Sequence, residues 1–406
     1  MPDIHVVLTQ DLNSPSGQGR YLPFAKELSK LGYELVICTT HSDYKTIQDK
    51  IQKFDSIVVR YVHQSHVRKR GDKKYYFSTP KLIAIALIST IKLILMVLRF
   101  RSKVIIVGKP HPMNSIAGII GRMIHHSILI VDIDDDEENS GNFRGYWQKQ
   151  VIRVFQRNVP RFADIVTTNT QYMKEKLIRS GIDPHKIFYL PNGIDICRLV
   201  TYKNNDLESS ELKARLGING KIVITYIGSI SFISHPIPLL LQAFKVVSKL
   251  IPNSVLLIIG GGEDIHKLMW EVRNLSLEQK VLYIGKVAYD EIVNYYSISD
   301  VAVDPVYDND AARGRCPLKL FEAWFFEVPF VTGDVGDRRM LSGEPPSALL
   351  CKPGDPAALA QAIIEVVNNP KLANALKLRG KERVKNYYWN ELVSNFVSFL
   401  NSLDIF

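Results

Sequence analysis

The sequence predicts an α/β fold made of two Rossmann-like domains, and three observations support this prediction. The chain has 406 residues, which is too long for one ordinary domain core. Hydrophobic residues make up 46% of it and charged residues 23%, a composition typical of globular proteins. Strand-like apolar runs alternate with helical patterns in two series, which is the signature of parallel sheets built from βαβ units. We therefore expect ligand-binding loops at the carboxyl ends of the strands in both domains.

The first series begins at the N-terminus. The opening residues MPDIHVVLTQ lack the basic and apolar regions of a secretory signal, so we expect a first strand there and no export. The four cysteines lie far apart, with no C-x-x-C pair and no zinc-type spacing, which favours free thiols in a reducing cytosol. In this half we expect strands at 4–9, 34–40, 103–108 and 127–132, and helices at 19–31 and 114–124.

The second series follows a polar, loop-like patch at 201–210, so we place the domain boundary near residue 200. The C-terminal segment NYYWNELVSNFVSFLNSL has apolar residues at helical spacing and follows a basic run, so this helix can pack away from the sheet that precedes it. In this half we expect strands at 221–228, 254–262, 281–285, 301–306 and 329–334, and helices at 237–250, at 266–275 and around Lys319.

One segment departs from the pattern of a soluble domain. Leu82–Phe100 is almost continuously apolar, with Lys92 alone inside it, and is close to the length that spans a bilayer. Three interpretations are open: a buried helix with a solvated basic loop before it, a monotopic helix on an anionic membrane surface, and a true span. The position of the segment between βα units of one domain and the lack of a second such stretch count against the span.

The formal net charge of +10 favours anionic partners, but charge alone does not separate nucleic acid, membrane surface and phosphorylated substrate. Basic residues gather beside the apolar helix rather than along a surface that could read bases. We therefore expect no nucleic-acid partner, and we expect membrane-surface contact through residues 66–100. The basic residues of this cluster are Arg68, Lys69, Arg70, Lys73 and Lys74.

Glycine-containing loops follow several predicted strands. Gly17 and Gly19 lie between the first strand and its helix, where glycine lets the backbone approach a ligand and the helix N-terminus attracts an anion. Their spacing is not G-x-G-x-x-G, because Leu22 occupies the last place, so a simple tight turn is the alternative.

The second domain has three such loops. Gly228 and Ser229, with His235, follow its first strand and could line an anion site, although a lone histidine is more often structural. The loop with Gly261 at its centre offers close backbone approach or a plain turn. Gly285, Lys286 and Val287 end another strand, where main-chain groups could recognise the edge of a base.

The stretch CPLKLFEAWFFEVPFVTGD places Lys319 and Glu322 on one helix face, three residues apart. The start of this helix, with Arg313 and Arg315 upstream, suits a diphosphate. Glu322, one turn further, is placed to accept hydrogen bonds from the two hydroxyls of a ribose. The alternative is a surface ion pair of little energetic value, which fits poorly because a strand-like run that should be buried follows the helix.

The order of these stretches resembles the family 4 retaining glycosyltransferases, also called group 1, of the GT-B fold. The resemblance covers nearly the whole chain and rests on the glycine loop followed by GYELVICTT, on TTNTQYMKEKLIRSGIDPHKIFYLPNGID with its Pro-Asn-Gly-x-Asp ending, and on LLLQAF, IIGGGED, PLKLFEAWFFEVPFVT and LLCKPGDPAALAQAI. It implies two facing Rossmann-like domains with a central cleft: residues 1–200 for the acceptor, completed by a crossover helix at 387–406, and residues 201–386 for the nucleotide sugar.

By this resemblance Glu322 looks like the second glutamate of the family's E-x7-E motif, the ribose ligand. The chain departs from the family pattern at three positions: Gly314 stands where the first glutamate is usual, and Ser229 and His235 stand where an arginine and a lysine are usual. Stabilisation of the leaving group is then left to Lys319, Arg315, Arg313 and backbone N–H groups. The donor pocket implied by the resemblance also includes Pro317 and Leu318.

The acidic run LIVDIDDDEENSGNF contains a D-x-D pair, Asp132 and Asp134, and resembles the start of an EF-hand. Glu137 occupies the place where the EF-hand loop requires glycine. We expect no metal at this run. The resemblance places a cleft-facing residue here, so Asp134 or Asp135 is expected to orient the acceptor hydroxyl or the sugar, and His111 after the preceding strand is a second candidate. A solvated or capping role is the alternative for each.

Together with these residues, the resemblance implies a retaining, metal-independent glycosyltransferase with no cofactor. The expected donor is a nucleotide diphosphate sugar of UDP or GDP type, and the expected acceptor is a glycan or a lipid-linked molecule of cell-envelope polysaccharide synthesis. We expect a cytoplasmic protein with peripheral contact at the inner face of the cell membrane. Two alternatives are a nucleotide-sugar epimerase of the same fold and a catalytically silent nucleotide-binding partner subunit, which the departures at Gly314 and Ser229 motivate.

Overall fold

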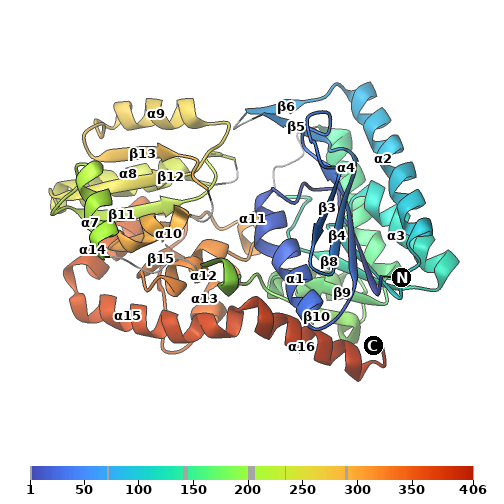
Figure 1. Ribbon diagram of the computed structural model, residues 1–406. Helices are drawn as coiled ribbons and strands as arrows, with labels where there is room; N and C mark the ends of the chain where they lie inside the picture. Colours follow the sequence, from blue (N-terminus) through green and yellow to red (C-terminus); the bar gives the residue numbers. More distant parts are fainter. Residues whose placement is uncertain are drawn as a thin grey trace. The chain divides into compact units, whose positions relative to one another are not determined.

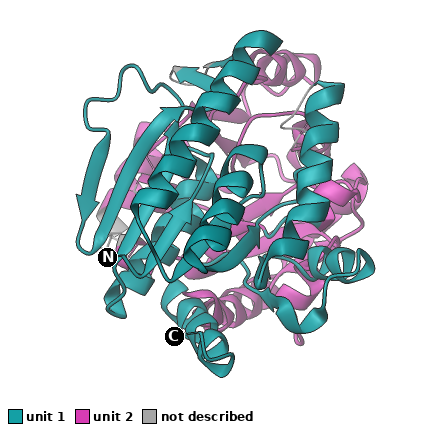
Figure 2. Ribbon diagram, turned by 90° about the vertical axis from the view of Figure 1, so that its right-hand side faces the viewer, with its two compact units in different colours: residues 1–193, 314–316, 389–406 teal, residues 194–313, 317–388 magenta. Residues whose placement is uncertain are grey.

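The computed structural model describes residues 2–70, 73–139, 145–199, 206–233, 235–288 and 291–405. Its chain divides into two compact units (Figure 2). Unit 1 consists of residues 1–193, 314–316 and 389–406, and unit 2 consists of residues 194–313 and 317–388. The predicted polar boundary at 201–210 lies partly outside the described residues, because 201–205 are among those not described.

Unit 1, coloured blue to green with its C-terminal helix in red in Figure 1, contains a sheet of order β10-β9-β8-β7-β1-β2-β4-β3, in which only the β3–β4 pair is antiparallel. The chain order reverses between β1 and β7, so their carboxyl ends form the topological switch point where ligands of such sheets usually bind. The strands are β1 (Ile4–Val7), β2 (Leu35–His41), β3 (Ile51–Phe54), β4 (Ile57–Gln64), β7 (Val104–Gly108), β8 (Ile128–Ile133), β9 (Ile165–Thr168) and β10 (Ile187–Tyr189).

Helices cover both faces of this sheet. Phe24 of α1 and Trp389, Phe396 and Leu400 of α16 pack on one face, so the C-terminal helix belongs to unit 1. Leu93 and Val97 of α2 pack on the other face together with α3. The helical elements are η1 (Gly17–Tyr21, a π-helix), α1 (Leu22–Lys30), α2 (Thr79–Arg99), α3 (Pro112–His125), α4 (Tyr146–Asn158), η2 (Val159–Phe162), α5 (Gln171–Arg179), η3 (Pro184–Lys186) and α16 (Trp389–Ser402).

Unit 2 has a wholly parallel sheet of order β13-β12-β11-β14-β15-β16, with its switch point between β11 and β14. The strands are β11 (Ile222–Ile227), β12 (Ser254–Ile259), β13 (Val281–Gly285), β14 (Val301–Asp304), β15 (Phe330–Gly333) and β16 (Leu349–Cys351). The helical elements are α6 (Ile196–Leu199), α7 (Asp206–Arg215), α8 (Ile237–Leu250), α9 (Ile265–Asn274), α10 (Ile292–Ser297), α11 (Asp310–Arg313), α12 (Leu318–Phe325), α13 (Arg338–Ser342), α14 (Pro356–Asn368), α15 (Pro370–Arg383) and η5 (Val384–Tyr387).

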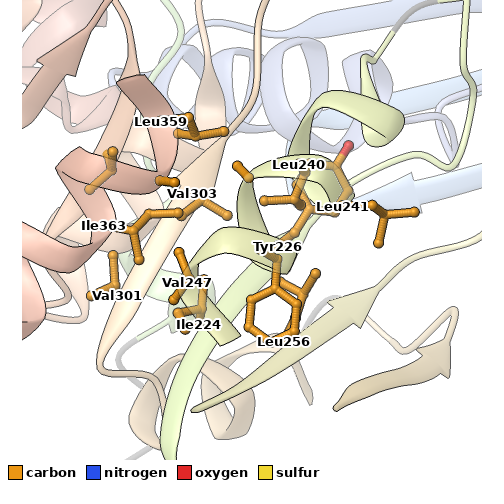
Figure 3. Close-up of a cluster of buried hydrophobic side chains, with 14 of the residues drawn as sticks. Ile224, Tyr226, Leu240, Leu241, Val247, Leu256, Val301, Val303, Leu359 and Ile363 are labelled. Carbon is orange, nitrogen blue, oxygen red and sulfur yellow. The ribbon is translucent and has the colours of Figure 1, made fainter. Parts of the chain in front are cut away.

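The largest core cluster of unit 2 lies between its sheet and helices α8 and α14 (Figure 3). Leu240 and Val247 of α8 are fully buried and meet Ile224 and Leu256 of the central strands. These strands read as continuous apolar runs because helices cover both faces of a parallel sheet. The polar loops of unit 2 therefore lie at the ends of the strands, outside the sheet faces that the helices cover.

Two segments differ from expectation. The basic segment before α2, which one interpretation took as a solvated loop, instead pairs as an antiparallel ribbon of β5 (Val67–Arg70) and β6 (Lys73–Tyr76). Helix α2 is long and apolar enough, by length and composition, to cross a membrane, yet only 22% of its most apolar window is buried. Its buried stripe is Ile85, Ser89, Leu93 and Val97, at intervals of four residues. The opposite apolar stripe is exposed, so the interpretation of a merely buried helix is wrong for that face.

Candidate functional site

Lys319 lies at the carboxyl edge of the unit 2 sheet, on the first turn of α12. Its Nζ atom is 2.8 Å from Oδ1 of Asp304, the last residue of β14, and 4.5 Å from the centre of the Tyr226 ring at the end of β11. A Cβ atom added to Gly228 would lie 3.1 Å from this Nζ atom. The Tyr226 hydroxyl donates to the carbonyl of Ser229 at 3.1 Å. The structure thus brings Lys319, Gly228 and Ser229 together at the switch point, and anion binding there stays a prediction.

Asp304 forms ion pairs with two basic side chains, Lys319 and Arg338. Its Oδ2 atom accepts a hydrogen bond at 3.0 Å from Arg338, which is 1% exposed. Burial alone would raise the pKa of Asp304, but the attraction of Lys319 and Arg338 holds this pKa well below its usual range. Asp304 is therefore a carboxylate at every physiological pH. Sequence reasoning missed this residue and Arg338, although a charged residue directly after the apolar run VAV was a usable signal.

Glu322, the predicted ribose ligand, is 6% exposed and accepts a hydrogen bond from the Tyr296 hydroxyl at 3.1 Å. The alternative of a surface ion pair with Lys319 is therefore wrong, because Glu322 is buried. Pro317 precedes α12 in an extended conformation, and Leu318 is the first residue of the helix. Tyr296 also stacks on Phe326 with ring centres 5.2 Å apart, which fixes the hydroxyl that contacts Glu322.

The glycines after β12 are required by the packing of two loops. Gly260 has φ +141°, and a Cβ atom there would lie 1.9 Å from the carbonyl oxygen of Gly228. A Cβ atom on Gly262 would lie 2.1 Å from the carbonyl oxygen of Ile230, whose N–H donates to Gly261. Because Gly260 and Gly262 have no Cβ atom, this run packs directly against the Gly228 loop. Neither a plain turn nor ligand contact alone explains that packing.

Other residues predicted on the donor side are more dispersed. Lys286 is exposed, and Val287 packs against a core cluster beside β13. His235 is half-buried before α8, where its N–H donates to the carbonyl of Ser231. Arg313 pairs with Asp308 at 2.8 Å on the exposed side of α11. These contacts leave the donor roles of all four residues as predictions.

Gly314 and Arg315 belong, with Cys316, to unit 1, whereas Lys319 belongs to unit 2. Asn192 of the Pro-Asn-Gly motif donates from its side chain to the Cys316 carbonyl at 3.0 Å. Gly314 is buried and Arg315 half-buried. The joint role of Arg315 and Lys319 at a diphosphate stays a prediction.

The glycines at the start of unit 1 serve the packing of the chain itself. A Cβ atom on Gly17 would lie 2.3 Å from the carbonyl oxygen of Leu12, and the Gly19 carbonyl accepts a hydrogen bond at 3.2 Å from the indole of Trp389. The contact with Trp389 joins the first loop to the C-terminal helix. Both glycines lie in the π-helix Gly17–Tyr21, so the alternative of a tight turn is wrong, and their approach to a ligand stays a prediction.

Arg20, which sequence reasoning missed, is the centre of a buried network. Its guanidinium donates to both carboxylate oxygens of Asp132, at 2.6 and 2.9 Å, and to the side-chain oxygen of Asn192 at 3.1 Å. Tyr21 and Thr167 donate to the same carboxylate. Although burial opposes it, Arg20 keeps the pKa of Asp132 below its ordinary value. The first aspartate of the D-x-D pair is therefore a structural anchor for the Pro-Asn-Gly motif.

Three other acidic residues of this run surround Lys109, which follows β7. The Lys109 Nζ atom lies 2.8 Å from Asp135, 2.6 Å from Glu137 and 3.4 Å from Asp134. Burial is the largest influence on Asp134 and raises its pKa to about 6, even though Lys109 opposes the shift. Asp134 is thus a buried carboxyl that titrates near neutrality, which is typical of functional sites. Within the described ranges, no group of three or more His, Cys, Asp or Glu residues is arranged to hold a metal ion.

His111 lies at the switch point of unit 1. Its Nδ1 atom is 2.6 Å from the Thr9 hydroxyl beyond β1, and its ring meets His66 edge-on with centres 6.3 Å apart. Burial lowers the pKa of His111 to about 4, so the ring is neutral at physiological pH. His111 follows β7, and Asp134 and Asp135 follow β8, the neighbouring strand. All three therefore lie at the carboxyl edge of the unit 1 sheet, where Lys109 contacts both aspartates. This edge is consistent with a hydroxyl-binding role and with a purely structural one.

Two family models match the chain. The model described as glycosyl transferases group 1 matches residues 208–383, and the model described as a glycosyl transferase 4-like domain matches residues 16–193. Together they cover most of both units.

Among curated relatives, the capsular polysaccharide biosynthesis glycosyltransferase CapM of Staphylococcus aureus is 26% identical over 348 residues, which cover 82% of this chain and 87% of CapM. A GDP-mannose-dependent phosphatidylinositol monomannoside mannosyltransferase of Mycolicibacterium smegmatis is 22% identical over 61% of this chain and 65% of its own. A D-inositol 3-phosphate glycosyltransferase of Rhodococcus jostii is 24% identical, and the match spans about half of its length, 52%.

Solved structures share the fold across the whole chain. The Anabaena protein HepE, in complex with UDP and glucose, superposes with a TM-score of 0.73 at 17% identity and covers 99% of this chain and 100% of its own. Sucrose-phosphate synthase from Thermosynechococcus elongatus gives a TM-score of 0.74 at 16% identity, with 98% of both chains covered.

Proposed function

We propose that this chain, which belongs to the group 1 glycosyltransferase family and has the GT-B fold, transfers a sugar from a nucleotide diphosphate sugar to a glycan or lipid-linked acceptor with retention of configuration. One observation carries the proposal. A lysine bound to Asp304, Lys319, and a buried carboxylate, Glu322, lie on the first two turns of one helix at the switch point of unit 2.

The donor nucleotide is proposed to bind unit 2. Glu322 accepts hydrogen bonds from the ribose hydroxyls, and Tyr296 orients the carboxylate for that contact. Lys319 and the backbone N–H groups at the start of α12 meet the diphosphate, because a cation and a helix N-terminus both favour anions. The names of the relatives support a donor of UDP or GDP type, since HepE was solved with UDP and with UDP-glucose and the Mycolicibacterium relative is GDP-mannose-dependent.

The chemistry requires no protein nucleophile. The bond between the sugar C1 and the distal phosphate oxygen breaks, and the nucleoside diphosphate leaves with the bonding electrons. The acceptor oxygen forms the new bond to C1 on the same face of the sugar, and its proton passes to the departing phosphate oxygen. Fixed positive groups stabilise the charge that grows on this oxygen, a form of catalysis that accounts for a large share of many enzyme rates.

The acceptor is proposed to meet unit 1. Asp134 is the residue best placed to orient an acceptor hydroxyl, since its buried carboxyl lies at the carboxyl end of β8 and its pKa is raised to about 6 by burial. Asp135 and His111 are proposed to share this task. Arg20 and Lys109 each lie near one carboxylate oxygen of Asp134, at 3.9 and 3.4 Å, and hold it in place.

Contact with the inner face of the cell membrane is proposed to run through α2 and the β5–β6 ribbon. One stripe of α2 exposes large apolar side chains, while the basic residues Lys69 and Lys74 pair across the ribbon before it. An apolar helix face beside basic residues suits an anionic bilayer surface. This contact would bring a lipid-linked acceptor to a cytoplasmic enzyme.

The proposal is tested by incubating the purified chain with radiolabelled UDP- and GDP-sugars and with a lipid extract or glycan acceptors. The expected result is acceptor-dependent transfer that is lost in the Glu322→Ala and Lys319→Ala variants. Conversion of the donor sugar without any acceptor would favour the epimerase. Nucleotide binding with no turnover of any donor would favour the silent partner subunit.

A further inference from the structure

Asp304 and Arg338 form a buried ion pair next to Lys319, and the family resemblance does not explain it. Asp304 ends β14 at the switch point and is 3% exposed, with one carboxylate oxygen on Lys319 and the other on Arg338. The three side chains carry two positive charges and one negative charge. A surplus positive charge thus stays at this edge of the sheet, although Lys319 has a carboxylate partner.

Arg338 is itself fixed from several directions. Its Nε atom donates to the Thr332 hydroxyl at 3.2 Å, and Nη1 donates to the carbonyls of Ala312 and Val335 at 3.3 and 3.2 Å. The Thr332 hydroxyl donates in turn to the Asp304 carbonyl at 2.9 Å. A planar guanidinium with this many fixed partners has little freedom to move, so the carboxylate that it contacts is fixed too.

Lys319 gains a defined position from this arrangement. A lysine side chain has four rotatable bonds and would sample many positions if its ammonium group were solvated. Here the ammonium group lies between the Asp304 carboxylate and the face of the Tyr226 ring, next to the backbone of Gly228. Preorganised positive charge is worth more to a transition state than charge that must reorganise during the reaction.

We propose that Asp304, held by Arg338, is a positioning residue that fixes the Lys319 ammonium group where the charge of the departing diphosphate develops. This inference rests on the proposed function, since it assigns a role to a residue that acts through Lys319. Asp304 does not touch the donor in this account. Replacing Asp304 therefore lowers turnover only to the extent that it displaces the Lys319 ammonium group.

The test is a double-mutant cycle on kcat/KM for the nucleotide sugar, built from Asp304→Asn, Lys319→Ala and the combination. We expect Asp304→Asn alone to lower kcat/KM by about tenfold to a hundredfold, because a small misplacement of a catalytic group has effects of that order. In the Lys319→Ala background the same change is expected to lower kcat/KM by less than about twofold. Asp300→Asn is the matched control, since Asp300 lies at the amino end of the same strand, where it accepts a hydrogen bond from the Val223 N–H at 2.8 Å.

An equal loss in both backgrounds would mean that Asp304 acts on the structure as a whole, and this would overturn the inference. An Asp304→Asn variant with wild-type kcat/KM would overturn it as well. If Asp304→Asn fails to fold, Arg338→Lys replaces it in the same cycle, because that variant keeps every charge and loosens the hold on Asp304. A wild-type chain that neither binds a nucleoside diphosphate nor turns over any nucleotide sugar would remove the proposed function, and this inference with it.

Discussion

The Nζ atom of Lys319 lies 2.8 Å from Oδ1 of Asp304, so the cation predicted to meet a diphosphate is held by a carboxylate from the neighbouring strand end. A surface lysine would be free to follow any anion. Lys319 instead has its ammonium group between Asp304 and the Tyr226 ring, which limits the positions that it can reach. The relationship favours a fixed electrostatic role over a loose ion pair.

Lys319→Ala is therefore expected to lower kcat for sugar transfer by about a hundredfold to a thousandfold, the range found when one preorganised partner of a developing anion is removed. Steady-state kinetics with the donor varied would measure it. Lys267→Ala is the control, because Lys267 is an exposed lysine of the same unit that also pairs with an aspartate, Asp264. A loss confined to KM would mean that Lys319 contributes equally to ground state and transition state, which contradicts the preorganised role.

Asp134 predicts a pH dependence of activity. Its pKa is raised to about 6 by burial, so its ionised form, which can accept a hydrogen bond from an acceptor hydroxyl, accumulates as pH rises through 6. We expect kcat/KM to rise with pH along an acid limb near pH 6, and we expect Asp134→Asn to abolish that limb. His111→Gln should retain it, because burial lowers the pKa of His111 to about 4. A limb unchanged in Asp134→Asn would exclude Asp134 as its source.

The raised pKa of Asp134 also makes the free energy of unfolding depend on pH. A carboxyl whose pKa is raised on folding binds its proton more tightly in the folded state than in the unfolded chain, where the pKa is 3.8. Its favourable contribution is present at low pH and is lost as pH rises from about 4 through 6. Asp134→Asn should flatten this part of the unfolding free energy profile, which denaturant titrations at several pH values would measure.

Gly260 provides a test of the loop packing. Gly260→Ala places a Cβ atom 1.9 Å from the Gly228 carbonyl oxygen at a backbone φ of +141°, so both a clash and backbone strain are expected. Gly285→Ala is matched to it, because Gly285 has φ +91° but open space around the added atom. Gly285→Ala should lower the free energy of unfolding by about 1 kcal/mol and Gly260→Ala by clearly more. Equal losses in urea unfolding would contradict the packing of the two loops.

The exposed face of α2 predicts binding to lipid vesicles. Leu87 and Ile91 are 60% and 58% exposed on that face, so a Leu87→Gln, Ile91→Gln double variant should sediment less with vesicles that contain anionic lipid. A Leu250→Gln variant, changed on α8 of unit 2 where Leu250 is 66% exposed, is the control. Binding by wild type and by both variants to the same extent would count against α2 as the docking face.

The alternation of apolar and amphipathic segments predicted strands β1, β2, β7, β8 and β11 to β15 and the helices around Lys319 and at 237–250, because parallel sheets need continuous apolar strands. Strands β3, β4, β9, β10 and β16 and the β5–β6 ribbon were missed. All but β4 have only three or four residues, and β4 largely alternates buried with half-buried residues instead of forming a continuous apolar run. Arg20, Lys109 and Asp304 were missed for another reason. Each is a single charged residue whose partners come from distant parts of the sequence, and only the folded chain brings them together.

The central claim is that unit 2 binds a nucleoside diphosphate through Glu322. The most direct measurement is a thermal-shift titration with UDP, GDP, ADP and CDP, with and without magnesium, on wild type and on Glu322→Gln. A ligand at a hundredfold excess over its dissociation constant stabilises the folded state by about 2.7 kcal/mol. We predict that UDP or GDP raises the Tm of the wild type, without a need for magnesium, and leaves that of Glu322→Gln nearly unchanged. Equal stabilisation of both chains, or of neither, would contradict the account.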